Sequence, residues 1–176
     1  MAHEGQQISN PRTGQRMTFV ELRGELLRTD TVNPLTGQRE PLHVHPKQEN
    51  GAEVVSGSLV FEVAGEQRRV AAGETIRVPA NMPHRFWNDS SEDARSIQFF
   101  RPALDIASFF ETMFALAQQG KLDEKGMPHP LQLAVMVPEF GDEIRPVSPP
   151  WWLLRPLMAV LGPVARLRGY RGRVEA

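Results

Sequence analysis

Two short stretches, Leu42-His43-Val44-His45-Pro46 and Val78-Pro79-Ala80-Asn81-Met82-Pro83-His84, decide how this sequence is interpreted. His43 and His45 are two residues apart, so an extended strand directs both imidazoles from the same face. The chain has five histidines, and three of them lie in these two stretches. A fold that placed the stretches side by side would bring three imidazoles to one point. Because histidine is the commonest metal ligand, the spacing favours a metal site, with surface or core histidines as the alternative.

Short strand-like runs, separated by glycines, surround both stretches. In Ser58-Leu59-Val60-Phe61-Glu62-Val63 the apolar residues Leu59, Phe61 and Val63 alternate onto one face. Similar runs continue to Ala94-Arg95-Ser96-Ile97-Gln98-Phe99-Phe100-Arg101. Many short strands at regular spacing are typical of an all-β barrel or jelly roll.

The residues around the second stretch resemble the second sequence motif of the cupin superfamily. Gly73, Pro79, His84 and Asn88 fall in register with that motif, and Asn81 replaces its second glycine. Asparagine also tolerates a positive φ, so this replacement is a mild one. The resemblance covers roughly residues 17 to 101. It implies an all-β double-stranded β-helix, the jelly-roll cupin barrel of RmlC-like and quercetinase-like proteins.

The first cupin motif is kept less completely. His43, His45 and Gly57 fall into place, but counting back from Gly57 puts Asn50 in the position of the family's glutamate, and Glu49 lies one residue early. The resemblance implies that the three histidines are metal ligands. Two alternatives remain for the fourth position: Glu49 reaches inward through a β-bulge, or Asn50 occupies it and the carboxylate is lost.

Three neutral imidazoles suit a divalent transition metal such as iron(II), zinc, nickel or manganese. An apolar chamber around such a metal favours a small hydrophobic or flat aromatic substrate. The candidate substrate contacts inside the barrel are Gln48, Val54, Phe61, Phe86 and Gln98.

The cupin resemblance leaves three functional classes open, because one fold hosts many chemistries. The leading hypothesis is a metal-dependent dioxygenase, an oxidoreductase resembling the quercetinase-like cupins. The second is a cyclase or isomerase that consumes no oxygen. The third is a non-enzymatic module that binds a small molecule.

Composition excludes some partners. The formal net charge is −1, which gives no electrostatic reason to expect nucleic acid as a partner. The chain has no cysteine, so disulfides and thiolate ligands are excluded. Residues 1–7 lack the basic and apolar regions of a signal peptide, so we expect a cytoplasmic protein. The family resemblance also implies a homodimer.

The character of the sequence changes after Arg101. We expect an N-terminal arm over residues 1–16, the barrel over 17–101, and a C-terminal α-helical extension packed on the barrel over 102–176. Apolar residues recur at helical spacing from Asp105 to Gln119. The apolar and then basic tail after Pro149 has two interpretations: a helix that packs on the barrel or on a second subunit, which we prefer, or a helix on a membrane surface with Trp151 and Trp152 as anchors.

Overall fold

Strand β10 (Ala94–Arg101) illustrates why these segments form sheets. Its side chains alternate: Ala94, Ser96, Gln98 and Phe100 are buried, and the residues between them are more exposed. Alternation of this kind turns one face of a sheet inward and the other outward. The inward face of β10 is partly polar, so the strands enclose more than a hydrophobic core.

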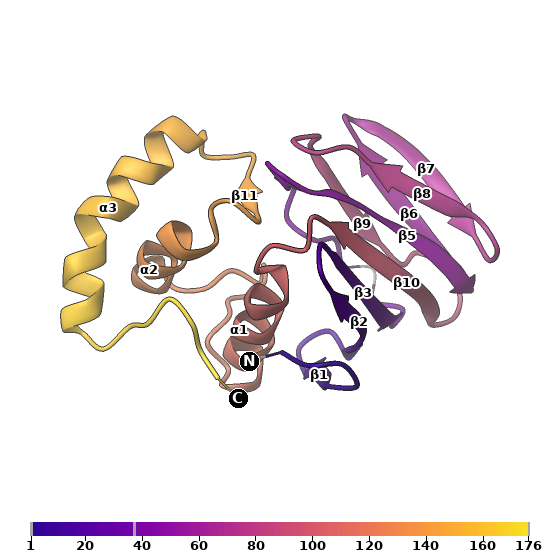
Figure 1. The fold of residues 1–176 in the computed structure, drawn as a ribbon, viewed down its shortest axis with the longest axis horizontal. Helices are drawn as coiled ribbons and strands as arrows, with labels where there is room; N and C mark the ends of the chain where they lie inside the picture. The colour runs from indigo at the N-terminus through magenta and orange to yellow at the C-terminus, as the bar shows by residue number, and fades with distance from the viewer. Residues whose placement is uncertain (1, 37, 176) are drawn as a thin grey trace.

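The computed structural model describes residues 2–36 and 38–175, and in them two antiparallel sheets form the cupin jelly roll (Figure 1). The first sheet has the strand order β1-β2-β3-β10-β5-β8, and the second has the order β11-β4-β9-β6-β7. Besides β10, the strands are β1 (Gln7–Asn10), β2 (Gln15–Arg23), β3 (Leu26–Asn33), β4 (His43–Val44), β5 (Glu49–Ser56), β6 (Ser58–Val63), β7 (Glu66–Ala71), β8 (Thr75–Val78), β9 (His84–Trp87) and β11 (Arg145–Pro146).

The two ends of the chain both contribute strands to the barrel sheets. Strand β1, within the expected N-terminal arm, pairs with β2 at the edge of the first sheet. Strand β11 comes from the expected helical extension and pairs with β4, which carries His43. The barrel is therefore larger than the expected range of 17–101.

After β10, the described residues form three helices: α1 (Ile106–Gln118), α2 (Pro130–Phe140) and α3 (Trp151–Leu167). Helix α1 packs on the barrel, where Ile106 and Phe114 join Phe19, Leu27 and Phe100 in one buried cluster. Apolar burial of this size contributes about 1.5–3 kcal/mol per large side chain. Helix α1 therefore packs against β2, β3 and β10 of the first sheet.

Helix α3 packs differently, because its inner face lies against α2 (Figure 1). Leu154, Met158 and Ala165 of α3 form a buried cluster with Ala134 and Val135 of α2. The helix continues through two internal prolines. No helix among the described residues is long and apolar enough to cross a membrane.

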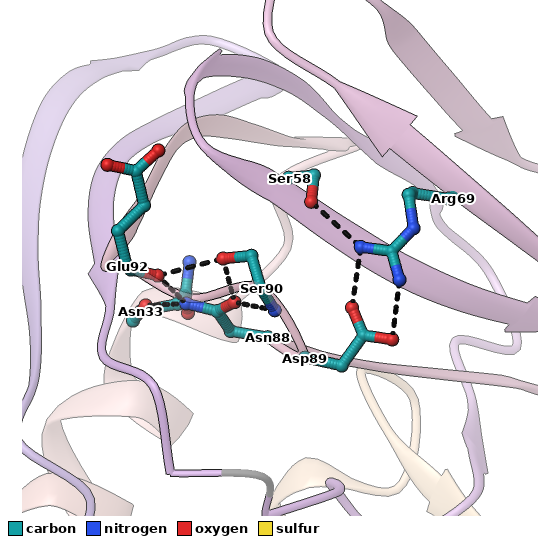
Figure 2. Close-up of polar contacts among 7 residues, drawn as sticks. All are labelled: Asn33, Ser58, Arg69, Asn88, Asp89, Ser90 and Glu92. Carbon is teal, nitrogen blue, oxygen red and sulfur yellow. Dashed lines mark hydrogen bonds and ion pairs between the residues drawn. The ribbon is translucent and has the colours of Figure 1, made fainter.

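Asn88, the last residue of the second motif, fixes the connection from β9 to β10 (Figure 2). Its amide Nδ2 donates hydrogen bonds to the carbonyl oxygens of Asn33 and Glu92, each at 2.8 Å. Its Oδ1 accepts from the Ser90 backbone N–H at 2.9 Å and from the Ser90 hydroxyl at 2.7 Å. Because Asn88 is buried and its polar atoms are satisfied, it ties β9 to the end of β3 at low energetic cost.

Candidate metal centre

Three histidines converge inside the barrel from the two stretches that carry the motifs. His43 on β4 lies directly opposite His84 on β9 in the antiparallel ladder, and His45 follows β4 on the same side. The imidazole centroids are 4.5 Å apart for His43 and His84, and 5.1 Å apart for His43 and His45. One nitrogen from each ring lies within 4.8 Å of the others, an arrangement consistent with a metal site.

Each imidazole is held by a backbone carbonyl at its Nδ1 atom. His43 Nδ1 lies 2.9 Å from the Pro41 oxygen, His84 Nδ1 lies 2.8 Å from the Met82 oxygen, and His45 Nδ1 lies 2.6 Å from the Glu143 oxygen. A carbonyl oxygen can only accept, so Nδ1 carries the hydrogen in all three rings. The lone pair is therefore on Nε2, the tautomer that a metal-binding histidine with this kind of support presents.

Burial keeps these rings neutral. Burial, followed by the neighbouring His84, lowers the pKa of His45 to about 4. Burial and the two other imidazoles lower the pKa of His43 well below its usual value, and burial lowers that of His84. Neutral imidazoles with a lone pair on Nε2 fit a divalent transition metal, since ligand nitrogens must be unprotonated. Nitrogens bound to one ion lie about 3–3.5 Å apart, so the cluster needs only a small contraction.

Of the two candidates for the fourth position, Asn50 faces the histidines and Glu49 does not. On β5 the side chains of Asn50, Ala52 and Val54 are buried, and Glu49 is on the opposite face. Asn50 Nδ2 lies 3.2 Å from His84 Nε2, whereas the Glu49 carboxylate pairs with Arg77 at 3.2 Å on the outside. The structure therefore does not bring Glu49 to the histidines, because no bulge turns it inward.

Two of the expected substrate contacts serve other purposes. Gln48 is fully buried beneath His45: its Oε1 lies 3.2 Å from His45 Nδ1, and its Nε2 donates to the carbonyls of Pro102 and Ala103 at 2.8 Å. Val54 is buried in the apolar cluster between the sheets with Leu59. Gln48 thus orients a histidine, and neither residue lines the cavity.

A cavity of about 340 Å³ adjoins the histidines, and its lining includes Phe61, Phe86 and Gln98, three of the candidate substrate contacts. The cavity extends between the barrel and the helices, where the extension supplies much of its wall. Its apolar lining includes Phe61, Phe86, Phe100, Phe109, Phe110, Met113, Met136 and Phe140. The amide Nε2 of Gln98 is buried and has no hydrogen-bond partner among the described residues. A buried unpaired donor costs about 1–3 kcal/mol, so a ligand that accepts from Gln98 would recover this cost.

No local sequence pattern predicts two further features of the site. Glu40 lines the cavity half-buried, and burial raises the pKa of its carboxyl to about 8. The carbonyl of Glu143, which holds His45, comes from the segment between α2 and β11. Only the pairing of β11 with β4 brings this distant carbonyl into place.

Comparison with known proteins agrees with this architecture. The chain is 35% identical over 66 residues to the polyketide synthase CurC of Streptomyces cyaneus, which covers 38% of this chain and 43% of that protein. It is 28% identical over 127 residues to an oxidoreductase of Arthrobotrys oligospora, covering 67% of this chain and 48% of that protein. The chain thus spans about half the length of the curated relatives it matches.

Among solved structures, KdgF from Halomonas sp. superimposes with a TM-score of 0.52 at 22% identity, covering 58% of this chain and 93% of that one. This likeness supports the fold. The family match itself extends over residues 31–100 and is to the cupin domain. It includes all three histidines, and so residues 31–100 of this chain belong to the cupin domain family.

Proposed function

We propose that this protein is a metal-dependent oxygenase that acts on a small, apolar or aromatic substrate held in the barrel. The observation that carries the proposal is the placement of three neutral Nε2 lone pairs at the wall of a largely apolar cavity. A divalent transition metal held by His43, His45 and His84 would supply Lewis-acid and redox chemistry there. The similarity to a protein named an oxidoreductase supports this choice.

The chain's own residues would orient the substrate and exclude water. Phenyl rings from the barrel and from α1 form walls that suit a flat aromatic molecule. Gln98 Nε2 is the donor available to a carbonyl or hydroxyl oxygen of that molecule. With a pKa of about 8, the Glu40 carboxyl is mostly protonated at neutral pH and can give or take a proton at the cavity wall.

A second candidate is a cyclase or isomerase that uses the same centre without consuming oxygen. The similarity to a protein named a polyketide synthase favours it, although this match covers only 43% of that protein. In this case the metal would polarise a substrate carbonyl, and Glu40 would transfer a proton. Asn50 is compatible with both candidates, because a neutral amide leaves the charge of the centre entirely to the metal.

Metal analysis and oxygen uptake test the proposal together. Protein purified anaerobically should contain about one transition metal ion per chain, and the His45→Ala variant should lose it, while the His3→Ala variant, changed at a histidine outside the cluster, should keep it. Loaded protein should then consume oxygen when given a flavonol as an aromatic probe. Metal binding and conversion of a polyketide-like probe without oxygen uptake would select the cyclase or isomerase. A folded protein that binds no metal would overturn both.

A further inference from the structure

Helix α3 is the outermost element of the molecule and lies farther from the barrel than α1 and α2 (Figure 1). It touches the rest of the protein through a narrow stripe. Of its 17 residues, only Leu154, Met158, Gly162 and Ala165 are buried. Most of the helix surface is therefore available to something else.

The available surface of α3 is apolar. Six large hydrophobic residues are exposed on it: Trp152 (76%), Leu153 (48%), Leu157 (50%), Val160 (73%), Val164 (45%) and Leu167 (89%). From Leu153 to Leu167 their spacing is four, three, four and three residues, which places them along one side of a helix. We call these six residues the outer strip. Contiguous exposed apolar patches of this kind mark interaction surfaces.

The charged side chains of α3 itself are all arginines, whereas Arg145 and Arg173, which lie on either side of it in the sequence, pair with acidic residues of other segments. Residues 144–174 contain six arginines and no aspartate or glutamate, although the whole chain has a net charge of −1. Arg155, Arg166 and Arg168 lie on α3 or at its end and are exposed. A helix with exposed apolar residues that include a tryptophan, and whose only charged residues are arginines, has the composition of helices that lie in the interface of an anionic lipid bilayer.

We infer that α3 binds an anionic lipid surface, lying flat with the outer strip in the headgroup region. The helix lies on such a surface and does not span it, since it has 17 residues and two internal prolines. A second copy of this chain fits the strip less well. Pairing two α3 helices strip to strip would bring together two helices whose charged residues are all arginines, so no ion pair could form between them.

This surface lies on the same helix that closes part of the cavity. Leu154 points from the inner side of α3 and lines the cavity that adjoins the histidines, whereas the outer strip faces away. Lipid binding through α3 would therefore bring the apolar cavity close to the bilayer. The inference about α3 does not depend on the proposed activity of the metal centre.

Vesicle flotation with the full chain tests the inference. Wild-type protein should bind vesicles of phosphatidylcholine with about 30% phosphatidylglycerol, and bind vesicles of phosphatidylcholine alone at least tenfold more weakly, because each arginine near an anionic surface contributes about fivefold. Added salt should weaken this binding. The double variant Val160→Glu/Leu167→Glu should lose at least tenfold in binding.

A matched control separates the strip from general charge effects. The double variant Val20→Glu/Val55→Glu changes two exposed hydrophobics on the barrel by the same charge and should bind as wild type does. Circular dichroism should show that both variants are folded. Absence of binding by wild type, or equal loss in both double variants, overturns the inference. A wild-type dimer that ignores vesicles and becomes monomeric in the strip variant assigns the strip to a second copy and overturns it as well.

Discussion

The barrel and helix α3 deviate from ordinary burial in opposite directions. Inside the barrel, polar side chains such as His45, Asn50 and Gln98 are buried. On α3, apolar side chains such as Trp152 and Leu167 are exposed. Buried polar groups and exposed apolar patches are the informative exceptions to the usual pattern. The buried imidazoles are consistent with a metal site in the barrel, and the exposed apolar residues of α3 are the basis of the lipid surface that we infer.

The two regions differ in packing tolerance as well. In the barrel, a Cβ added at Gly51 would collide with the Ile76 carbonyl and lie 2.8 Å from the Phe99 ring. On α3, a Cβ added at Gly162 would meet the Ala134 carbonyl at an ordinary 3.4 Å. At these two glycines, an added methyl group has no room in the barrel but has room at the contact between α3 and α2.

The largest expected effect is the difference in stability between alanine substitutions at these two glycines. Gly51→Ala should lower the free energy of unfolding by at least about 3 kcal/mol, because backbone atoms must move to admit the methyl group. Gly162→Ala should be neutral or raise it by up to about 1 kcal/mol, since alanine favours the helix. Urea denaturation of both variants measures the difference. Equal effects at the two positions would show that the barrel and α3 do not differ in packing tolerance.

The second largest expected effect is a pH dependence of the free energy of unfolding, which arises from the barrel and is measured in metal-free protein. The pKa of His45 is about 4 in the folded state and near its usual value when unfolded. Between these values the unfolded chain binds more protons, so the stabilising contribution of neutral His45 is complete above about pH 6.5 and is lost as the pH falls toward 4. The free energy of unfolding should fall by up to about 3 kcal/mol through this contribution.

Glu40 has the opposite sign: its pKa rises from 4.5 to about 8 on folding, so its stabilising contribution is lost as the pH rises through this range. The measurement is therefore the difference in unfolding free energy between wild type and His45→Gln, determined at several values from pH 4 to pH 7. Both proteins keep Glu40, so its contribution cancels. A difference that stays constant with pH would mean that His45 is not buried as a neutral ring.

The smallest expected effect is a change in the zinc affinity of the barrel. Asn50→Asp should place a carboxylate beside His84 and tighten zinc binding by about tenfold, since an anionic ligand joins three neutral ones. Glu49→Gln, one residue away on the outer face, should leave zinc affinity unchanged and serves as the control. Calorimetric titration of zinc into wild type and both variants measures these affinities. Weaker binding in Glu49→Gln alone would restore the alternative in which Glu49 reaches inward.

Much of the barrel was predictable because local periodicity determines it. The spacing of His43 and His45, together with the motif around His84, predicted both the jelly roll and the three-histidine cluster, and the family match and the geometry agree. The same alternation also predicts which of the two candidates, Glu49 or Asn50, faces the histidines. Asn50, Ala52 and Val54 alternate onto the inner face, which leaves Glu49 outside.

Other features of the site have no local pattern. The hydrogen bond from His45 to the Glu143 carbonyl joins residues 98 positions apart, and only the folded chain shows it. Gln48 and Gln98 are both buried glutamines, and sequence could not say that one faces the carbonyls under His45 and the other faces the cavity. The expected homodimer and the partners of the chain stay predictions.

The bond from His45 to Glu143 and the pairing of β11 with β4 have a consequence for modularity. The boundary after Arg101 separates strands from helices in the sequence, but it is not a boundary between independent units. A chain cut there would keep all three imidazoles and lose the acceptor that fixes one of them and much of the cavity wall. Transferring this barrel to another protein therefore requires the segment that follows β10 as well, up to and including β11.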